Sequence, residues 1–266
     1  MAEAKPTAHE LNLGRETNLA MERYAVRHSA SLVLFTSDTR VELGSATCIA
    51  IGGKYFLATA GHNLESVDNE AIRIVANQTT SDRWMPILGK NWVKEAGIDV
   101  GWVEIETDAA RKSKLTFLQI ESLGTFEKPC LRSLYLIQGL PAELSNVKER
   151  KISLASLGFM TIPAEPDGVS YDYNPDVEII LEYSDSDYPL PIPKGMSGGG
   201  VWAIPNDLEP LVWSPEKSRL VGIVKTWREK SKHLAAVKIE HWLELVGSDF
   251  PELAKEVDRA LVASSD

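Results

Sequence analysis

Three segments of the sequence each place one reactive side chain beside an apolar run. The segment YFLATAGHNLE ends in small residues and delivers His62 after the run. The segment GIDVGWVEIE places Asp99 at the start of another run, and PKGMSGGGVWAI surrounds Ser197 with four glycines. A serine, a histidine and a carboxylate together can perform nucleophilic attack assisted by a general base. The set therefore predicts hydrolytic chemistry.

Each of these residues, taken alone, also has a purely structural explanation. A histidine after a strand can be held by loop hydrogen bonds, and an aspartate before a strand is a common turn residue. A carboxylate at a largely buried strand start is costly unless it is paired, however, and an imidazole N–H would satisfy Asp99. His62 is the candidate partner.

The glycines around Ser197 allow two interpretations. Glycine clusters most often form flexible loops. A nucleophilic serine instead needs a sharply bent backbone whose N–H groups converge on one point, and glycines at 195, 198, 199 and 200 permit such bends. The second interpretation predicts that backbone N–H groups near Ser197 converge where an oxyanion would develop.

The segments that must position these residues are mostly short and β-rich. They are separated by Gly, Pro, Asn or Asp and have no amphipathic helices between them, which indicates an all-β sandwich or a pair of barrels. The predicted strands are SLVLFTS, ATCIAIGG, YFLATAG, AIRIVA, VGWVEIE, SLYLIQG, KISLASLGFM, VEIILEY, GGVWAI and LVGIVKTW.

Helices are predicted at both ends of this β-rich body. Residues 16–28 have helical apolar spacing after an acidic first turn. Near the carboxyl end, VKIEHWLELV and FPELAKEVDRALV each place apolar residues on one face.

In chain order, TAGH, GIDVGWVEI and GMSGGGVW resemble the three signature segments of the trypsin-like serine peptidases, whose usual forms are TAAH, aspartate-aliphatic-Ala/Gly and G-D/N-S-G-G. RLVGIVKTW resembles the strand that lines the family's substrate channel, and AVKIEHWL resembles its closing helix. The resemblance extends from about residue 31 to about residue 246. It implies a chymotrypsin-like double six-stranded antiparallel β-barrel, here with an N-terminal helical arm and C-terminal helices.

The resemblance also implies a division of the chain. Residues 1–30 are the helical arm, and residues 31–125 form a first β-barrel carrying His62 and Asp99. Residues 126–237 form a second β-barrel carrying Ser197, and residues 238–266 form the C-terminal helices. In the implied triad, Ser197 attacks a peptide carbonyl, His62 moves the proton and Asp99 orients His62. The resemblance also implies that the amides of Gly195 and Ser197 form the oxyanion hole.

Met196 departs from the pattern of secreted members, which have an aspartate there to pair with the amino terminus released by activation cleavage. A methionine cannot form that ion pair, so the site is expected to be preformed or switched by another contact, including a regulatory protein partner. This departure and the lack of the secreted branch's disulfides resemble intracellular and bacterial relatives.

The residues that would line the substrate channel show no clear specificity. Pro191 occupies the position that forms the base of the primary specificity pocket in digestive members of the family. Trp227 falls near a position where many members have a glycine. Two lysines could attract acidic substrate residues or simply be solvated. The channel candidates are Pro191, Lys194, Lys225, Thr226 and Trp227.

Composition excludes several other classes of protein. The chain has 266 residues, 44% of them hydrophobic, which is enough for a large core. The formal charge of −10 disfavours nucleic acid as a partner, and no uninterrupted apolar stretch is long enough to span a membrane. Cys48 and Cys130 both lie in apolar segments, so we expect reduced core thiols. Because no metal-ligand spacing is found, we expect no metal or cofactor. No secretory signal is found either, so we expect a cytoplasmic location.

The sequence therefore predicts a serine endopeptidase that forms an acyl-enzyme on protein or peptide substrates. Two alternatives stay open: a catalytically silent binding or regulatory module of the same fold, and an esterase that uses the same triad.

Overall fold

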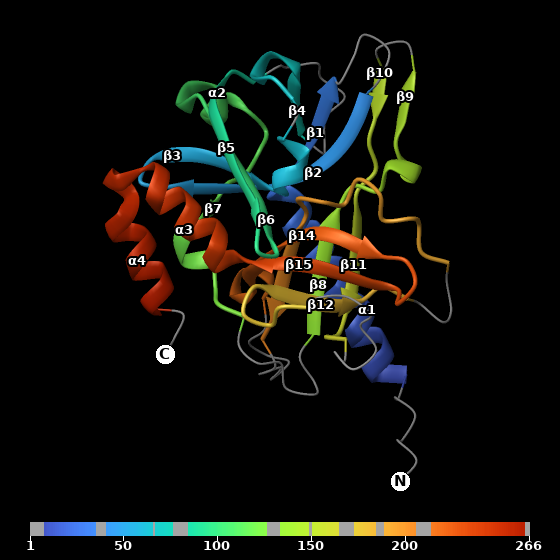
Figure 1. Ribbon diagram of the computed structural model, residues 1–266. Helices are drawn as coiled ribbons and strands as arrows, with labels where there is room; N and C mark the ends of the chain where they lie inside the picture. The colour runs from blue at the N-terminus through green and yellow to red at the C-terminus, as the bar shows by residue number, and fades with distance from the viewer. Residues whose placement is uncertain are drawn as a thin grey trace.

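The computed structural model describes residues 8–35, 41–65, 67–76, 85–126, 134–148, 151–164, 173–184, 189–205 and 214–263. Within these residues the chain forms two large, mainly antiparallel sheets, one from each half of the sequence, and a small two-stranded ribbon (Figure 1). Cys130 lies outside the described residues. No helix in the described part of the chain is long and apolar enough to cross a membrane.

The first sheet has six strands in the order β4-β1-β2-β3-β6-β5, and the short β7 adds a parallel pair with β2. Apolar residues alternate with polar ones along several of these strands, so one face of the sheet forms a buried core. The strands are β1 (Ser29–Phe35), β2 (Val41–Ile51), β3 (Lys54–Thr59), β4 (Ile72–Ala76), β5 (Ile87–Glu95), β6 (Ile98–Ile105) and β7 (Leu118–Gln119).

The second sheet also has six strands, in the order β11-β8-β13-β14-β15-β12. Together the two sheets form the predicted all-β, chymotrypsin-like pair of half-barrels, so the fold prediction is confirmed. The strands are β8 (Leu134–Gly139), β11 (Leu157–Thr161), β12 (Glu178–Glu182), β13 (Gly200–Ile204), β14 (Arg219–Arg228) and β15 (His233–Lys238), and a separate ribbon pairs β9 (Asn146–Lys148) with β10 (Lys151–Ser153).

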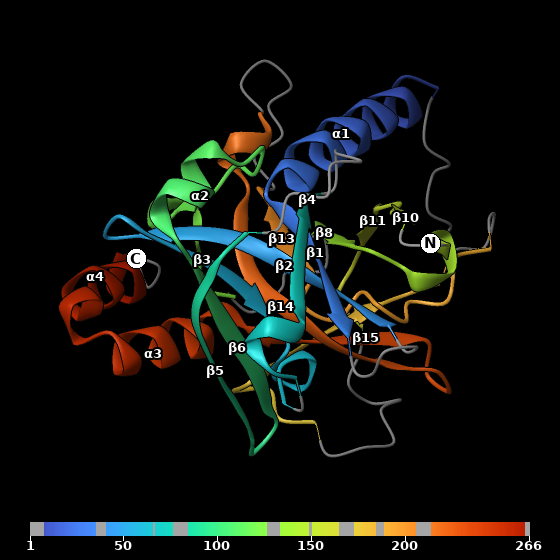
Figure 2. The same ribbon diagram turned by 90° about the horizontal axis from the view of Figure 1, so that it is seen from above.

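Helices lie on different sides of the two sheets (Figure 2). The first, α1, packs against β8 and β11 of the second sheet, whereas α3 packs against β6 and β14. The α-helices are α1 (Ala8–Arg27), α2 (Thr107–Lys112), α3 (Ile239–Asp249) and α4 (Ala254–Ala263). The short 3₁₀ turns are η1 (Gly61–Asn63), η2 (Asn69–Ala71), η3 (Ile120–Ser122), η4 (Ala142–Leu144), η6 (Pro215–Lys217) and η7 (Pro251–Leu253).

Several element boundaries differ from the sequence prediction. Helix α1 begins earlier than residue 16, and KISLASLGFM forms two strands, β10 and β11, in different sheets. The prediction missed β5, which is half-exposed at a sheet edge, and β15, which is rich in alanine and runs directly into α3. Neither strand shows the strong apolar alternation on which the prediction depended.

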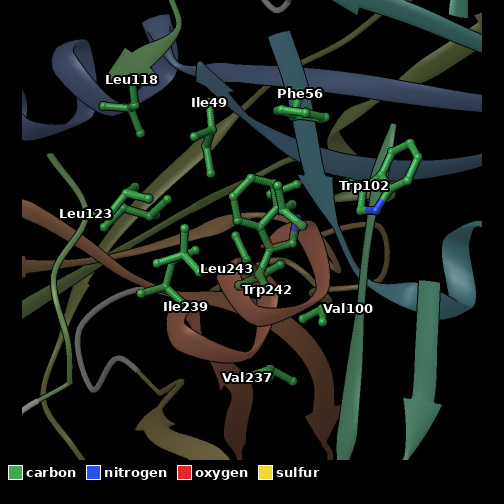
Figure 3. Close-up of a cluster of buried hydrophobic side chains, with 14 of the residues drawn as sticks. Ile49, Phe56, Val100, Trp102, Leu118, Leu123, Val237, Ile239, Trp242 and Leu243 are labelled. Carbon is green, nitrogen blue, oxygen red and sulfur yellow. The ribbon is translucent and has the colours of Figure 1, made fainter. Parts of the chain in front are cut away.

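A shared core joins the two sheets to the C-terminal helices. Figure 3 shows Trp242 of α3 in the middle of this cluster, with Phe56 on one side and Ile239 on the other. The indole of Trp242 is fully buried, and its Nε1 donates to the carbonyl of Gly101 at 3.1 Å. Because Gly101 lies in β6, this bond fixes α3 to the strand that carries Asp99.

Candidate active site

The carboxylate of Asp99 is joined to His62 by two hydrogen bonds, one to the imidazole and one to the backbone. Nδ1 of His62 lies 2.7 Å from Oδ2 of Asp99, and the backbone N–H of His62 donates to Oδ1 at 2.8 Å. Strand β3 ends at Thr59 and the turn η1 follows, so His62 projects from a rigid strand end, as the sequence indicates. The aspartate is buried and the imidazole is about a third exposed, so His62 can still face a substrate.

The surroundings of Asp99 favour its charged form. Burial alone raises the pKa of Asp99, but the hydrogen bonds and charge of His62 lower it, and the ammonium of Lys225 adds to the lowering. The net result is a pKa below the ordinary value for aspartate. Asp99 is therefore a carboxylate that can fix one tautomer of His62.

Ser197 is held against the first sheet by its backbone carbonyl. That oxygen accepts hydrogen bonds from the amide of Ser45 at 2.9 Å and from Nδ2 of Asn63 at 3.0 Å. Since Asn63 directly follows His62, the bond places the serine segment beside the histidine segment. The hydroxyl of Ser197 itself donates to the carbonyl of Lys225 at 3.0 Å, and the described hydrogen bonds include none between Ser197 and His62.

The segment before Ser197 forms a tight turn with a defined peptide orientation. The amide of Met196 donates to the carbonyl of Pro193 at 3.0 Å, and Gly195 has a φ of +93°. The carbonyl of Lys194 accepts from the amide of Ala142 at 2.7 Å. In a trans peptide the next N–H points the opposite way, so the amide of Gly195 faces away from Ala142.

The amides of Gly195 and Ser197 have no acceptor among the hydrogen bonds of the described residues. Their neighbours differ, because the amides of Met196, Gly198 and Gly199 are all bonded to backbone carbonyls. Two free N–H groups, two residues apart on a fixed turn, can together bind an oxygen anion.

Gly198 is required for the close approach of the two sheets. It has a φ of +93°, and a Cβ on it would lie 1.9 Å from the carbonyl oxygen of Ser45. The hydroxyl of Ser45 also donates to the carbonyl of Gly195 at 2.8 Å and accepts from the amide of Leu140 at 2.8 Å. Hydrogen bonds thus hold the serine turn to Ser45 in the first sheet and, through Ser45, to Leu140 directly after β8 of the second sheet.

Met196 is fully buried among apolar side chains of the second sheet. Its sulfur lies 3.8 Å from the hydroxyl of Tyr183, which also donates to the carbonyl of Pro191 at 2.9 Å. Apolar packing therefore holds this position in the described structure.

The five channel candidates lie in three different environments. Pro191 and exposed Lys194 flank the serine turn, whereas Thr226 and half-buried Trp227 lie on β14. Lys225 matches neither alternative that the sequence left open for it. Its side chain is 12% exposed and forms an ion pair with the buried Glu178, so its charge is not free to attract a substrate.

The sequence analysis missed four residues that shape this site: Ser45, Asn63, Ala142 and Glu178. Glu178 had a usable signal, since it is a carboxylate at the start of the apolar run VEIILEY, the same pattern that drew attention to Asp99. Ala142 contributes only its backbone amide, so its residue type carries no signal. Within the described residues, no group of three His, Cys, Asp or Glu side chains could hold a metal ion.

The two half-barrels, with His62 and Asp99 on the first and Ser197 on the second, define the chymotrypsin-like fold. Two solved structures that share this fold are described as inactivated protease paralogues of the scabies mite. The paralogue S-I1 superposes with a TM-score of 0.59 at 11% identity, covering 87% of this chain and 96% of its own. The paralogue S-D1 gives 0.58 at 12% identity, covering 88% and 95%. The sequence matches no protein-family model and no curated protein.

Proposed function

We propose that this protein is a serine endopeptidase that hydrolyses peptide bonds through an acyl-enzyme on Ser197. One observation carries the proposal: the doubly bonded His62–Asp99 pair is joined, through Asn63, to a serine turn on which two amides have no acceptor among the described residues. This arrangement supplies a base, a residue that orients the base, a nucleophile and an anion site, which acyl transfer requires together.

In the proposed mechanism, the hydroxyl of Ser197 leaves the carbonyl of Lys225 and turns toward Nε2 of His62. Oxygen then attacks the peptide carbonyl while His62 takes the proton, and Asp99 stabilises the imidazolium. The amides of Gly195 and Ser197 bind the oxyanion, and each such donor is worth about 3 to 4 kcal/mol. His62 returns the proton to the leaving amine, and water hydrolyses the acyl-enzyme by the same steps.

The proposed site needs no activation cleavage. The bond from Ala142 to Lys194 and the burial of Met196 hold the serine turn without a charged partner. This supports a constitutive site, whereas a regulatory partner remains a prediction. Burial raises the pKa of the Cys48 thiol, which suits an inert core cysteine. The proposed cytoplasmic location rests on the low cysteine content of the sequence.

A fluorophosphonate probe tests the proposal directly, because it reacts only with an activated serine. We expect the wild type to be labelled at Ser197, and Ser197→Ala and His62→Gln to lose labelling. Ser231→Ala is the matched control, since Ser231 Oγ bonds the carbonyl of Arg228 in the β14–β15 turn outside the site. A folded wild type that is never labelled would overturn the proposal.

Two observations favour the silent binding module as the second candidate. The hydroxyl of Ser197 is bonded to Lys225 rather than to His62, and both structural neighbours are described as inactivated. Absence of labelling in folded wild type supports this candidate. If labelling occurs, cleavage of casein by wild type but not by Ser197→Ala distinguishes a peptidase from an esterase.

A further inference from the structure

Lys225 contacts both halves of the site. Its backbone carbonyl accepts the hydroxyl of Ser197 at 3.0 Å, and its Nζ donates to the carbonyl of Gly97 at 2.7 Å and to the carboxylate of Glu178. Gly97 lies in the turn between β5 and β6, two residues before Asp99. One residue thus links the nucleophile to the turn that begins the aspartate strand.

A β-bulge gives Lys225 this position. In the pairing of β14 with β15, Val224 is opposite Ala236 and Thr226 is opposite Ala235, so Lys225 has no partner across the ladder. A bulge frees backbone groups from the sheet and redirects the side chain. The freed carbonyl reaches Ser197, and the side chain reaches the first sheet.

The ion pair between Lys225 and Glu178 is largely buried. The side chains of Lys225 and Glu178 are 12% and 1% exposed, and the second carboxylate oxygen of Glu178 accepts from the amide of Asn174 at 3.3 Å. Desolvating two charges cancels much of their attraction, so a buried pair is weak evidence for stability. Its location beside Asp99 indicates a different role.

The charges around Asp99 come from several elements. Lys225 acts on Asp99 from β14, and Glu178 balances Lys225 from β12. On β5, Lys94 lies opposite Asp99 in the ladder and also acts on it, but it is about half exposed and paired with Glu65. Exposed charges are screened by water, so the buried pair has the stronger effect.

We infer that Lys225 and Glu178 form a positioning pair, which holds the turn before Asp99 against the second sheet and sets the electrostatic balance of the Asp99–His62 couple. The inference rests on the proposed function, because the couple matters only if His62 acts as a base. Neither residue touches the reacting atoms, so both are positioning residues rather than catalytic ones.

Opposite single-charge variants provide the test. Lys225→Met leaves Glu178 unpaired and adds negative potential, so protonated His62 is favoured and the acid midpoint of fluorophosphonate labelling moves to higher pH. Glu178→Gln leaves Lys225 unpaired, and the midpoint moves to lower pH. We expect each shift to be about 3- to 10-fold in proton affinity. Lys225→Arg keeps the charge, so its acid midpoint should stay near that of the wild type. Lys94→Met removes an exposed charge and is the control, so its midpoint should shift much less than that of Lys225→Met.

Two further measurements keep the test decisive. The double variant Lys225→Met/Glu178→Gln is isosteric and uncharged, so it should fold even if a single variant does not. The acid midpoint of its labelling should return toward that of the wild type. Its labelling rate should be lower than that of the wild type, because the carbonyl of Gly97 no longer receives the hydrogen bond from Lys225. NMR titration of the His62 ring measures the same shifts without requiring activity. If the wild type is not labelled, the proposed function is overturned. The ring titration still tests whether Lys225 and Glu178 act on the Asp99–His62 couple.

Three results would overturn the inference. The first is equal midpoints in folded single variants, and the second is shifts of the same sign in both. The third is a double variant that labels as fast as wild type.

Discussion

The amide of Ala142 donates a 2.7 Å hydrogen bond to the carbonyl of Lys194, and this bond fixes the peptide group that precedes Gly195. With the carbonyl held on the Ala142 side, the amide of Gly195 is left free on the other side. A residue of η4 that contributes no side-chain chemistry thus sets the direction of the Gly195 amide, on which the proposed anion site depends.

Substituting Gly195 should disable this anion site. A Cβ at φ +93° would lie 2.7 Å from the carbonyl oxygen of Leu140 and 3.1 Å from the amide of Ala142. We expect Gly195→Ala to lower the labelling rate about 10²- to 10³-fold. Gly53→Ala is the control, because Gly53 has a φ of +80° with no heavy atom near its Cβ position. It should lose about 1 to 2 kcal/mol of stability and label at the wild-type rate; equal labelling rates in the two variants would contradict this role of Gly195.

Restoring a carboxylate beside the serine should destabilise the protein. Met196 is fully buried in an apolar cluster, so Met196→Asp would place an unpaired charge there. We expect the free energy of unfolding to fall by about 3 to 5 kcal/mol in urea titrations. Met196→Leu conserves volume and should lose less than about 1.5 kcal/mol. If the free energy of unfolding of Met196→Asp equals that of the wild type, the prediction is wrong and a cationic group must pair with the new carboxylate.

Removing the anchor of α3 should loosen the strand that carries Asp99. Trp242→Ala deletes a fully buried indole and its bond to Gly101, so it should lose about 3 to 5 kcal/mol of unfolding free energy. Val262→Ala, on the exposed side of α4, should change stability by less than about 0.5 kcal/mol. Equal effects of the two substitutions would show that α3 is not an anchor.

Asp99 should contribute stability that depends on pH. Its pKa in the folded protein lies below the unfolded value of about 4, so the contribution is complete above pH 4 and is lost as pH falls through the folded pKa. The difference in unfolding free energy between wild type and Asp99→Asn should therefore be largest near neutral pH and shrink below about pH 4. A difference that stays constant from pH 6 to pH 2.5 would contradict the lowered pKa.

The sequence predicted the fold because its signals are local. The alternation of apolar residues and the glycines and prolines between strands depend only on neighbours along the chain, and they identified most strands. The grouping of His62, Asp99 and Ser197 depended on a resemblance in their flanking residues, since nothing within one segment shows what it meets in space.

The missed parts of the site are contacts between distant segments. Ala142 acts through a backbone amide, and Lys225 depends on a bulge that the pattern of side chains does not reveal. For the same reason the sequence does not reveal the ion pair of Lys225, because its partner Glu178 is 47 residues away. Such pairs require the register of several strands to be known.

The two ends of the chain complete opposite parts of the molecule. Helix α1, the first helix of the described residues, packs on β8 and β11, and α3 packs on β6 and supplies Trp242 to the shared core. Each sheet has apolar residues that pack within its own half, but the core shared by both sheets also needs Trp242 and its neighbours on α3. That shared core therefore cannot be completed during synthesis until α3 has followed both sheets out of the ribosome.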